Sequence, residues 1–385
     1  MALTGSSGGN KPPAANQIQP DWKQEAGPLR KYLNDPSVSE IMVNRYDRLF
    51  IERNGLIEEI DARFDSVEAV NRFVQSMAVY VGKEINRRSP FLEARLPDGS
   101  RLNAVLSPVA LDGPSISIRK FSTVQVDSKG LVNKGTLSQK ALYFLSQLVI
   151  ARQNIVISGG TGSGKTTLLN AISSFISSRE RVVTIEDTAE LQINSKNIVR
   201  LESKIALHQE TEVTVQDLLK SSLRMRPDRI IIGECRGAEA WDMLMAMNTG
   251  HAGSLTTLHA NTAYDALRRL EAMVLRSDVG VPLDMIKKDI GRTINFIIQV
   301  ERSADGVRRI VQISEVLEGD AEGYQIRDIF TYSPQGGLES LGTVPRFVKQ
   351  ITNPKNKLDD KFFHPNFKVK LEGMDNPDST TTKAS

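Results

Sequence analysis

A β-branched apolar run, a glycine-rich loop and a helical pattern follow one another without interruption near the middle of this chain. Ile155, Val156 and Ile157 predict a short buried strand. The next segment reads Gly159-Gly-Thr-Gly-Ser-Gly-Lys-Thr166, which fits the complete phosphate-binding loop pattern. Apolar residues at helical spacing over 168–176 place a helix N-terminus directly after the loop, where the backbone dipole favours an anion. This order of strand, loop and helix predicts a nucleoside triphosphate site within an α/β fold.

The residues of the loop have separate expected roles. Its glycines let successive backbone N–H groups turn inward around a phosphate chain. Lys165 can reach the β- and γ-phosphates, and the Thr166 hydroxyl can bind Mg²⁺. We therefore expect ATP and Mg²⁺ as cofactors. The candidate cofactor-binding residues are Gly159, Gly160, Thr161, Gly162, Ser163, Gly164, Lys165, Thr166 and Thr167.

Two further predicted strands end in acidic residues. The apolar strand Arg229-Ile-Ile-Ile-Gly ends at Glu234, and Thr184-Ile leads into Glu186 and Asp187. Ligands of parallel α/β sheets sit beyond the carboxyl ends of the strands, so these acids are expected near the triphosphate. Such an acid holds the hydration shell of Mg²⁺ or orients the attacking water, and the longer reach of glutamate suits the second role. Glu234 and Glu186 are thus candidate catalytic residues and, together with Thr166, candidate metal-site residues.

The remaining polar candidates near strand ends have weaker signals. His259 follows a predicted strand and could donate a hydrogen bond to the γ-phosphate, although a histidine bonded within the core is the alternative. For His251 both interpretations stay open. Glu190 is either a helix-surface charge or part of a metal site. Cys235 is most simply a small apolar residue after the acidic strand end.

The pattern of elements divides the chain into five segments. Residues 1–20 contain almost no large apolar side chain and are expected to be disordered. Residues 21–122 predict an α+β domain with an antiparallel sheet. Residues 123–136 are polar and punctuated by glycine, as in a linker. Over 137–351 strands and helices alternate, which is typical of a parallel sheet covered on both faces. Residues 352–385 are polar and are expected to form a flexible tail.

Within the first domain the expected elements are short. Residues 40–43 and 49–52 predict one hairpin, and residues 92–96 and 101–106 a second, around Pro97-Asp98-Gly99. Asp65, with Glu68 three residues on, resembles a capping box at the start of a helix that extends to Val81. A further strand is expected at residues 115–119.

Composition excludes several classes of protein. Lys and Arg total 49 against 46 Asp and Glu, a net charge of +3, which does not suggest nucleic acid as a partner. No stretch approaches the roughly 18 apolar residues of a membrane span. One cysteine excludes an intrachain disulfide and suits a reducing cytoplasm. We therefore expect a cytoplasmic protein.

Four blocks of sequence together resemble one family. They are the loop at 159–166, Ile185-Glu-Asp187, residues 223–234 and residues 248–261 (Asn-Thr-Gly-His-Ala-Gly-Ser-Leu-Thr-Thr-Leu-His-Ala-Asn). The chain resembles the secretion ATPases of type II secretion, type IV pili and type IV secretion. It looks most similar to the CpaF/TadA branch, which drives the Tad (Flp) pilus. Further matches to that branch are Asp35–Asn44, Arg95–Arg101 and Val344–Phe347.

The resemblance implies an architecture and a set of roles. It implies a RecA-like motor domain, a PAS-like N-terminal domain, and a ring of six subunits peripheral to the inner membrane, working with the platform proteins of a pilus or secretion machine. It implies a Walker A role for residues 159–166, an Asp box for Glu186 and Asp187, a Walker B role for Glu234 and a His box for His259. A type IV or type II secretion motor is the alternative to a pilus motor.

In that family, arginines of the N-terminal domain reach the nucleotide phosphates. Arg95, Arg101 and Arg119 lie at the matching strands here, and a cation aimed at a triphosphate stabilises transition-state charge. One of the three is expected to be an ordinary solvated strand residue. Two other classes stay open, a nucleic-acid motor, which shares the RecA-like core, and a scaffold that binds ATP without useful turnover.

Overall fold

The computed structural model describes residues 22–96, 98–121, 126–204, 211–319, 323–350 and 358–369. The chain divides into two compact units, Met1–Thr123 and Val124–Ser385, and each is described by itself. The segment 1–20, which the sequence predicts to be disordered, lies outside the described residues. In the described part of the chain, no helix combines the length and the apolar character needed to cross a membrane.

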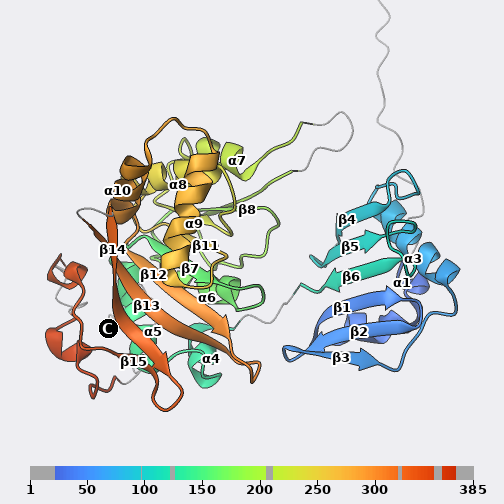
Figure 1. The fold of residues 1–385 in the computed structure, drawn as a ribbon, viewed down its shortest axis with the longest axis horizontal. Coiled ribbons are helices and arrows are strands. Elements are labelled where there is room, and N and C mark those ends of the chain that lie inside the picture. The colour runs from blue at the N-terminus through green and yellow to red at the C-terminus, as the bar shows by residue number, and fades with distance from the viewer. Residues whose placement is uncertain are drawn as a thin grey trace, which may run out of the picture. The chain divides into compact units, whose positions relative to one another are not determined.

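The N-terminal unit is an antiparallel sheet with helices on one face (Figure 1). The order of its six strands is β3-β2-β1-β6-β5-β4. Both predicted hairpins are present, β1 with β2 and β4 with β5. Its elements are α1 Trp22–Glu25, η1 Gly27–Leu29, α2 Arg30–Asn34, β1 Val38–Arg45, β2 Arg48–Arg53, β3 Leu56–Ile60, α3 Val67–Tyr80, β4 Phe91–Arg95, β5 Arg101–Val105 and β6 Ser115–Arg119.

Period-two and helical patterns account for the core of this unit. Ile41 and Val43 of β1 alternate with partly exposed residues and face the fully buried Phe73 of α3 in one apolar cluster. Helix α3 begins one residue later than the sequence predicts. Its cap is Ser66, whose hydroxyl accepts a hydrogen bond from the Ala69 N–H at 3.3 Å, so the Asp65 assignment is wrong. Strand β3 was not predicted because its residues are mostly exposed and show no alternation.

The C-terminal unit is built on a nine-stranded sheet of order β15-β14-β13-β12-β7-β11-β10-β8-β9. Strands β12, β7, β11, β10, β8 and β9 run parallel, while β13, β14 and β15 extend the sheet in antiparallel fashion. Its helices are α4 Ser128–Asn133, α5 Gln139–Ile150, α6 Lys165–Ser173, α7 Val215–Ser222, α8 Glu239–Asn248, α9 Ala263–Arg276, α10 Leu283–Thr293, η2 Arg346–Gln350 and η4 Asp360–Phe363. Its strands are β7 Ile155–Gly159, β8 Val182–Glu186, β9 Ile198–Glu202, β10 Arg229–Ile232, β11 Leu255–Leu258, β12 Phe296–Arg302, β13 Arg308–Glu318, β14 Tyr324–Ser333 and β15 Gly337–Ser340.

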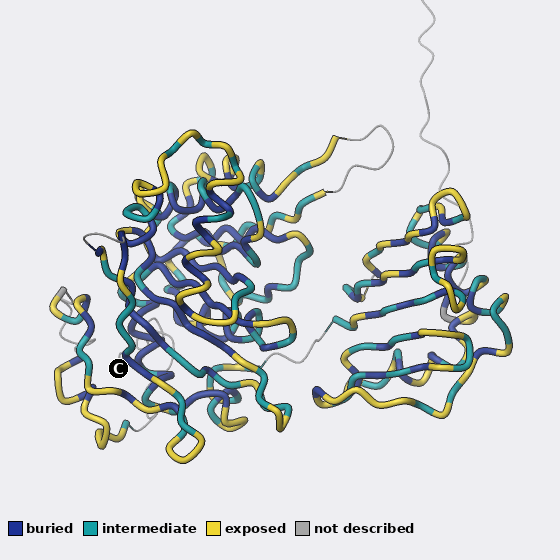
Figure 2. The backbone as a smooth tube through the Cα atoms, viewed as in Figure 1, coloured by how far each residue is buried: buried dark blue, intermediate teal, exposed yellow. Residues whose placement is uncertain are grey.

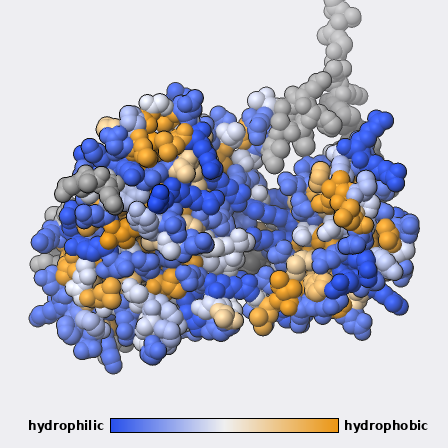
Figure 3. Space-filling view, in the orientation of Figure 1, coloured by the Kyte–Doolittle hydropathy of each residue, from blue (hydrophilic) through white to orange (hydrophobic). Residues whose placement is uncertain are grey.

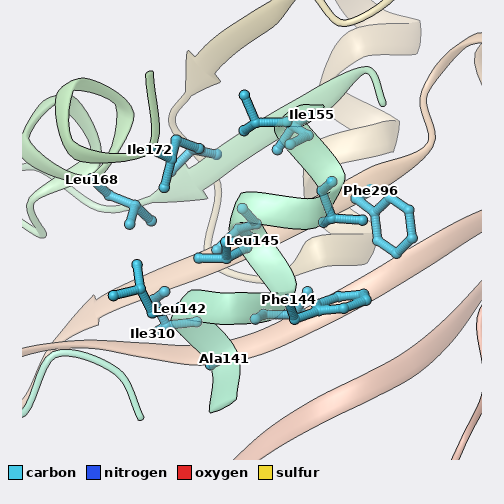
Figure 4. Packing of buried hydrophobic residues seen from close by; sticks show 14 of the residues in the cluster. Ala141, Leu142, Phe144, Leu145, Ile155, Leu168, Ile172, Phe296 and Ile310 are labelled. Atoms are coloured by element: carbon cyan, nitrogen blue, oxygen red, sulfur yellow. The ribbon is translucent and has the colours of Figure 1, made fainter. Parts of the chain in front are cut away.

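The central parallel strands are buried on both faces, as the near-continuous apolar runs require (Figure 2). Ile155 and Ile157 face one apolar cluster, formed with α5 and α6, and Val156 faces a second, formed with helices α7 to α10. Figure 4 shows the first cluster, where Phe144 and Leu145 of α5 pack toward β7 and β12. Strand β7, which leads into the phosphate-binding loop, is therefore packed between two apolar clusters.

Two predicted segment boundaries need correction. Within the expected linker 123–136, residues 128–133 form α4, because Asp127 caps the helix and Leu131 is buried in the core of the C-terminal unit. Within the expected flexible tail 352–385, residues 358–369 are described and dock onto that core. Phe363 is fully buried and its ring lies 5.7 Å from that of Phe144, edge to face. Aromatic burial therefore anchors part of a segment whose overall composition is polar.

Exposed large apolar side chains occur in both units. The face in Figure 3 is mostly hydrophilic and carries hydrophobic residues in small separate groups. The most exposed of them is Leu111, at 92% relative accessibility.

Candidate active site

The glycine-rich loop connects β7 to α6 at the carboxyl edge of the parallel sheet. Gly162 and Gly164 have φ angles of 69° and 95°, values that favour glycine. A Cβ atom on Gly159 would lie 2.2 Å from the Val300 carbonyl oxygen of the neighbouring strand β12. Glycine is therefore required at these three positions, at one by close strand approach and at two by backbone conformation.

Lys165 begins α6 and is almost fully buried, with 7% relative accessibility. Its Nζ donates hydrogen bonds to the carbonyl oxygens of Gly159 at 3.0 Å and Gly160 at 2.8 Å. It also lies 3.5 Å from His259 Nδ1. The loop carbonyls thus hold the ammonium group within the curve of the loop, where a phosphate chain would enter.

Four acidic or basic side chains from neighbouring strand ends form a chain of contacts that ends at Lys165. Glu234, two residues beyond β10, lies 3.1 Å from His259 Nε2 through Oε1 and 2.7 Å from Arg236 Nη2 through Oε2. Arg236 Nη1 also lies 3.2 Å from Asp187 Oδ2, at the end of β8. Because β8, β10 and β11 run parallel, their carboxyl ends lie at one edge. The structure therefore joins three of the four motif blocks through charged contacts.

The electrostatics of this cluster keep Glu234 ionised. Burial acts against its charge, but the hydrogen bond and charge of Arg236, with smaller contributions from His259 and Lys165, hold the pKa of Glu234 below its ordinary value. Burial and the positive charge of Lys165 lower the pKa of His259, although Glu234 opposes them. At neutral pH the cluster therefore contains a carboxylate acceptor beside a neutral imidazole.

Glu186 is the last residue of β8, and its side chain lies against Gly233, the residue before Glu234; a Cβ atom on Gly233 would lie 2.9 Å from Glu186 Cγ. Its Oε2 accepts hydrogen bonds from the backbone N–H groups of Glu190 at 2.7 Å and Leu191 at 2.8 Å. Its Oε1 is buried and has no hydrogen-bond partner in the described part of the chain. Burial raises the pKa of Glu186 despite these hydrogen bonds. An unpartnered buried carboxylate oxygen suits a hydrated Mg²⁺, since hard cations prefer oxygen ligands.

No cluster of three or more His, Cys, Asp and Glu side chains capable of holding a metal occurs among the described residues. A Mg²⁺ ion here would therefore depend on the Thr166 hydroxyl, water and phosphate oxygens, with Glu186 and Glu234 as outer partners. That arrangement fits a phosphate-binding loop, in which the metal is bound largely through the nucleotide.

Three other residues singled out by the sequence are His251, which lies away from this cluster, Glu190 and Cys235. His251 Nδ1 lies 3.2 Å from the Ala246 carbonyl oxygen, and His251 precedes β11, at the end of that strand opposite to His259. The backbone of Glu190 contacts Glu186. Cys235 is buried against Met273, and burial raises its thiol pKa, which agrees with the apolar role expected of it.

Arg95, Arg101 and Arg119 belong to the N-terminal unit, where they form a single row. Arg95 pairs directly with Arg101, and Arg101 with Arg119, across β4, β5 and β6. Cross-strand partners project from the same face, and like charges placed opposite one another repel. Glu40, opposite Arg119, is partly buried, and burial raises its pKa while Arg119 lowers it. A row of three cations on one face of a sheet is suited to an anionic ligand.

Three arginines near the cluster were missed at the sequence level. Arg236 lies two residues after Glu234, so the local sequence held a signal for it. Its position is set by Glu239, whose Oε1 accepts hydrogen bonds from the Arg236 and Gly237 N–H groups. Arg302 and Arg308 approach the loop from the β12–β13 hairpin. No local pattern connects that hairpin to the loop.

A glycine-rich loop after the central strand of a parallel sheet, with acids at the ends of two neighbouring strands, defines a protein of the P-loop class with a RecA-like core. The chain belongs to the type II/IV secretion system protein family, whose model matches residues 22–324. This membership agrees with the broader resemblance inferred from the motifs, and it does not distinguish the CpaF/TadA branch.

Individual relatives support the family assignment. A conjugal transfer protein TrbB of Rhizobium radiobacter is 37% identical over 296 residues, covering 76% of this chain and 86% of the relative. An uncharacterized protein of Methanocaldococcus jannaschii is 45% identical over 238 residues, and the match covers 60% of this chain and 33% of that relative's length. The solved structure of the Legionella pneumophila ATPase DotB has a TM-score of 0.51 at 24% identity, covering 76% of this chain and 80% of DotB. At that identity the likeness to DotB concerns the fold.

Proposed function

We propose that this protein is a Mg²⁺-dependent ATP hydrolase that acts as the motor subunit of a secretion or pilus machine. The observation that carries the proposal is the meeting of Lys165, Glu234 and His259 beside Glu186. These side chains come from four separate segments. Their contacts assemble an anion site next to the ionised carboxylate of Glu234, which can accept a hydrogen bond from water. Such convergence is expected of phosphoryl-transfer chemistry and is not required by the fold alone.

In the proposed reaction the residues of the chain divide the work. The loop N–H groups and Lys165 hold the triphosphate and neutralise its charge. Glu234 accepts a hydrogen bond from the attacking water and aligns it with the γ-phosphorus. His259, neutral and held against Glu234 at 3.1 Å, donates from Nε2 to that carboxylate while its Nδ1 faces Lys165 as an acceptor. It would therefore donate to a phosphate oxygen by exchanging partners as the phosphate charge changes.

Bound Mg²⁺ supplies charge neutralisation at the β- and γ-phosphate oxygens. Thr166 would bind it directly, while Glu186 and Glu234 would accept hydrogen bonds from its waters. The partnerless Oε1 of Glu186 supports this assignment.

The N-terminal unit contributes positive charge in the proposal. Arg95, Arg101 and Arg119 would meet phosphate oxygens, in the same subunit or from a neighbour in a homo-hexamer. Their register, which places all three on one face of the sheet, supports this role. Movement of one unit against the other would occur at the connection that ends at Asp127, where α4 begins.

We also propose where this motor works and which kind of machine it serves. We propose a cytoplasmic, membrane-peripheral position, with inner-membrane platform proteins as partners and no nucleic acid as substrate. The motif resemblance favours assembly or retraction of a Tad (Flp) pilus. A type IV or type II secretion system is the alternative, and the conjugal transfer relative favours a transfer machine over a pilus.

The decisive test compares the variant Glu234→Gln with the control Glu318→Gln, an exposed acid paired with Arg292. The first should bind ATP with near-normal affinity and release phosphate on the order of 10² to 10³ times more slowly. The control should behave as the wild type. Normal phosphate release by Glu234→Gln would contradict the water-orienting role. A wild type that binds ATP and releases no phosphate would support a scaffold instead.

A further inference from the structure

A long-range hydrogen bond joins the tip of the β12–β13 hairpin to the phosphate-binding loop. Arg308, the first residue of β13, donates from Nε to the Gly162 carbonyl oxygen at 2.8 Å, across 146 residues of sequence. Its aliphatic stem passes over Gly164, where an added Cβ would lie 3.1 Å from Arg308 Cδ. The guanidinium group of Arg302 lies on the same side, with Nη1 4.0 Å from the Cβ position of Gly162. The hairpin thus contacts the loop at two of its glycines.

The hydrogen bond from Arg308 fixes the orientation of one peptide unit in the loop. The Gly162 carbonyl and the Ser163 N–H belong to the same planar trans peptide, so they point in opposite directions. With the carbonyl held toward Arg308, the Ser163 N–H points across the loop. There it donates a long, and therefore weak, hydrogen bond of 3.4 Å to the Gly160 carbonyl oxygen. A contact of that length is easily exchanged for a phosphate oxygen. Arg308 therefore keeps a backbone donor aimed into the phosphate site.

Backbone hydrogen bonds close the turn of the hairpin that carries Arg308. Arg302 and Arg308 are the last cross-strand pair before the turn, and the turn is closed by a hydrogen bond from the Ser303 N–H to the Val307 carbonyl at 2.9 Å. A hydrogen bond can orient the loop only if its donor is itself held in place, and the closed turn holds the backbone of Arg308.

We propose that Arg308 is a positioning residue for nucleotide binding, which sets the phosphate-binding loop in its ligand-ready conformation through the hydrogen bond from its Nε to Gly162. The contribution is preorganisation, because a loop already in its bound conformation loses less entropy when the phosphate arrives. The inference rests on the proposed nucleotide-binding function and extends it to a residue of the antiparallel part of the sheet. Arg302 adds positive charge on the same side of the loop.

Two length-matched substitutions separate the hydrogen bond from the charge. In Arg308→Gln, the amide nitrogen occupies the same place along the side chain as Nε, so a donor is kept while the charge is lost. In Arg308→Met, the chain length is kept without a donor or a charge. Arg309→Met is the control. Arg309 is the next residue and carries the same charge, but it pairs with Asp305 and not with the loop.

The full-length chain is titrated with ADP and Mg²⁺ by calorimetry, and phosphate release is measured over a range of ATP concentrations. Arg308→Met should raise the Kd for ADP and the KM for ATP about tenfold, as expected for one charge-assisted hydrogen bond, with kcat nearly unchanged. Arg308→Gln should stay within about threefold of the wild type, and so should Arg309→Met. Hydrogen exchange at residues 159–166 should accelerate in Arg308→Met and not in Arg308→Gln.

Several results would overturn the proposal. Equal losses in Arg308→Gln and Arg308→Met would assign the effect to charge and not to the hydrogen bond. An equal loss in Arg309→Met would assign it to the integrity of the hairpin, and no loss in Arg308→Met would remove the role altogether. A wild-type chain that binds no ADP would instead refute the proposed function itself, so the two failures are distinguishable.

Discussion

The buried ion pair at the start of β10 offers a stability test that can be worked out from the structure. Arg229 is completely buried, and its guanidinium donates to Glu180 through Nε at 2.7 Å and Nη2 at 3.0 Å. Nη1 lies 3.3 Å from the Gly253 carbonyl oxygen. Arg152, half exposed, also contacts Glu180 at 3.0 Å. The pair therefore holds the start of the strand whose far end leads to Glu234.

The variant Glu180→Gln leaves the Arg229 charge buried without a counter-charge. Removing one partner of a buried pair costs about 3–5 kcal/mol. For a unit of this size, that corresponds to a fall in Tm of roughly 6–20 °C. The double variant Glu180→Gln with Arg229→Met removes the stranded charge as well, so it should be more stable than Glu180→Gln alone. The exposed pair Arg292–Glu318 supplies the control, since solvent screens it and Glu318→Gln should leave the unfolding midpoint nearly unchanged.

The assay should report on the C-terminal unit alone, because two units can unfold separately. The chain has two tryptophans, Trp22 in the N-terminal unit and Trp241 in α8. In a Trp22→Phe background, the fluorescence of Trp241 follows the unfolding of the unit that contains Arg229. Equal midpoints for Glu180→Gln and Glu318→Gln would refute the reasoning, as would a double variant less stable than Glu180→Gln.

Three further predictions concern the C-terminal segment, the buried acid and the arginine row. Phe363→Ala should destabilise the C-terminal unit by about 3–5 kcal/mol in denaturant unfolding. Phe367→Ala, at a position that is 40% exposed, should have a much smaller effect. Similar losses of stability in the two variants would contradict the docking of this segment. Because the pKa of Glu186 is raised in the folded state, its protonation stabilises the fold at low pH and this contribution is lost as pH rises through the folded pKa. The stability of the wild type relative to Glu186→Gln should therefore increase as pH falls from 7 toward 4.5, and a pH-independent difference would argue against a buried charge. Arg101→Gln should slow ATP turnover by roughly 10³ at saturating ATP while Arg48→Gln, on the same sheet, leaves it unchanged; equal rates would exclude the arginine row from the reaction.

Local signals in the sequence were sufficient for the phosphate-binding unit and for most elements around it. The strand 155–159 and the loop are contiguous, so β-branched residues, glycines and Lys165 make both recognisable from local sequence, although the orientation of the Gly162 peptide also depends on the distant Arg308. Thr214 and Asp217, three residues apart, form a capping box in which both hydrogen bonds are present, a motif that is likewise local. The acids at 186 and 234 could be placed at one edge because parallel strands align their carboxyl ends.

Contacts between distant segments were decided only by the tertiary structure. The Arg308 contact with Gly162 and the Arg236 contact with Asp187 join segments whose separation carries no periodic signal. The docking of Phe363 on Phe144 likewise depends on a core that exists only after the sheet has formed. A local pattern specifies the conformation of a few neighbouring residues, since its energy comes from caps, turns and spacing. Which long side chain reaches which loop depends on strand order and register, and these are set by the packing of the whole unit.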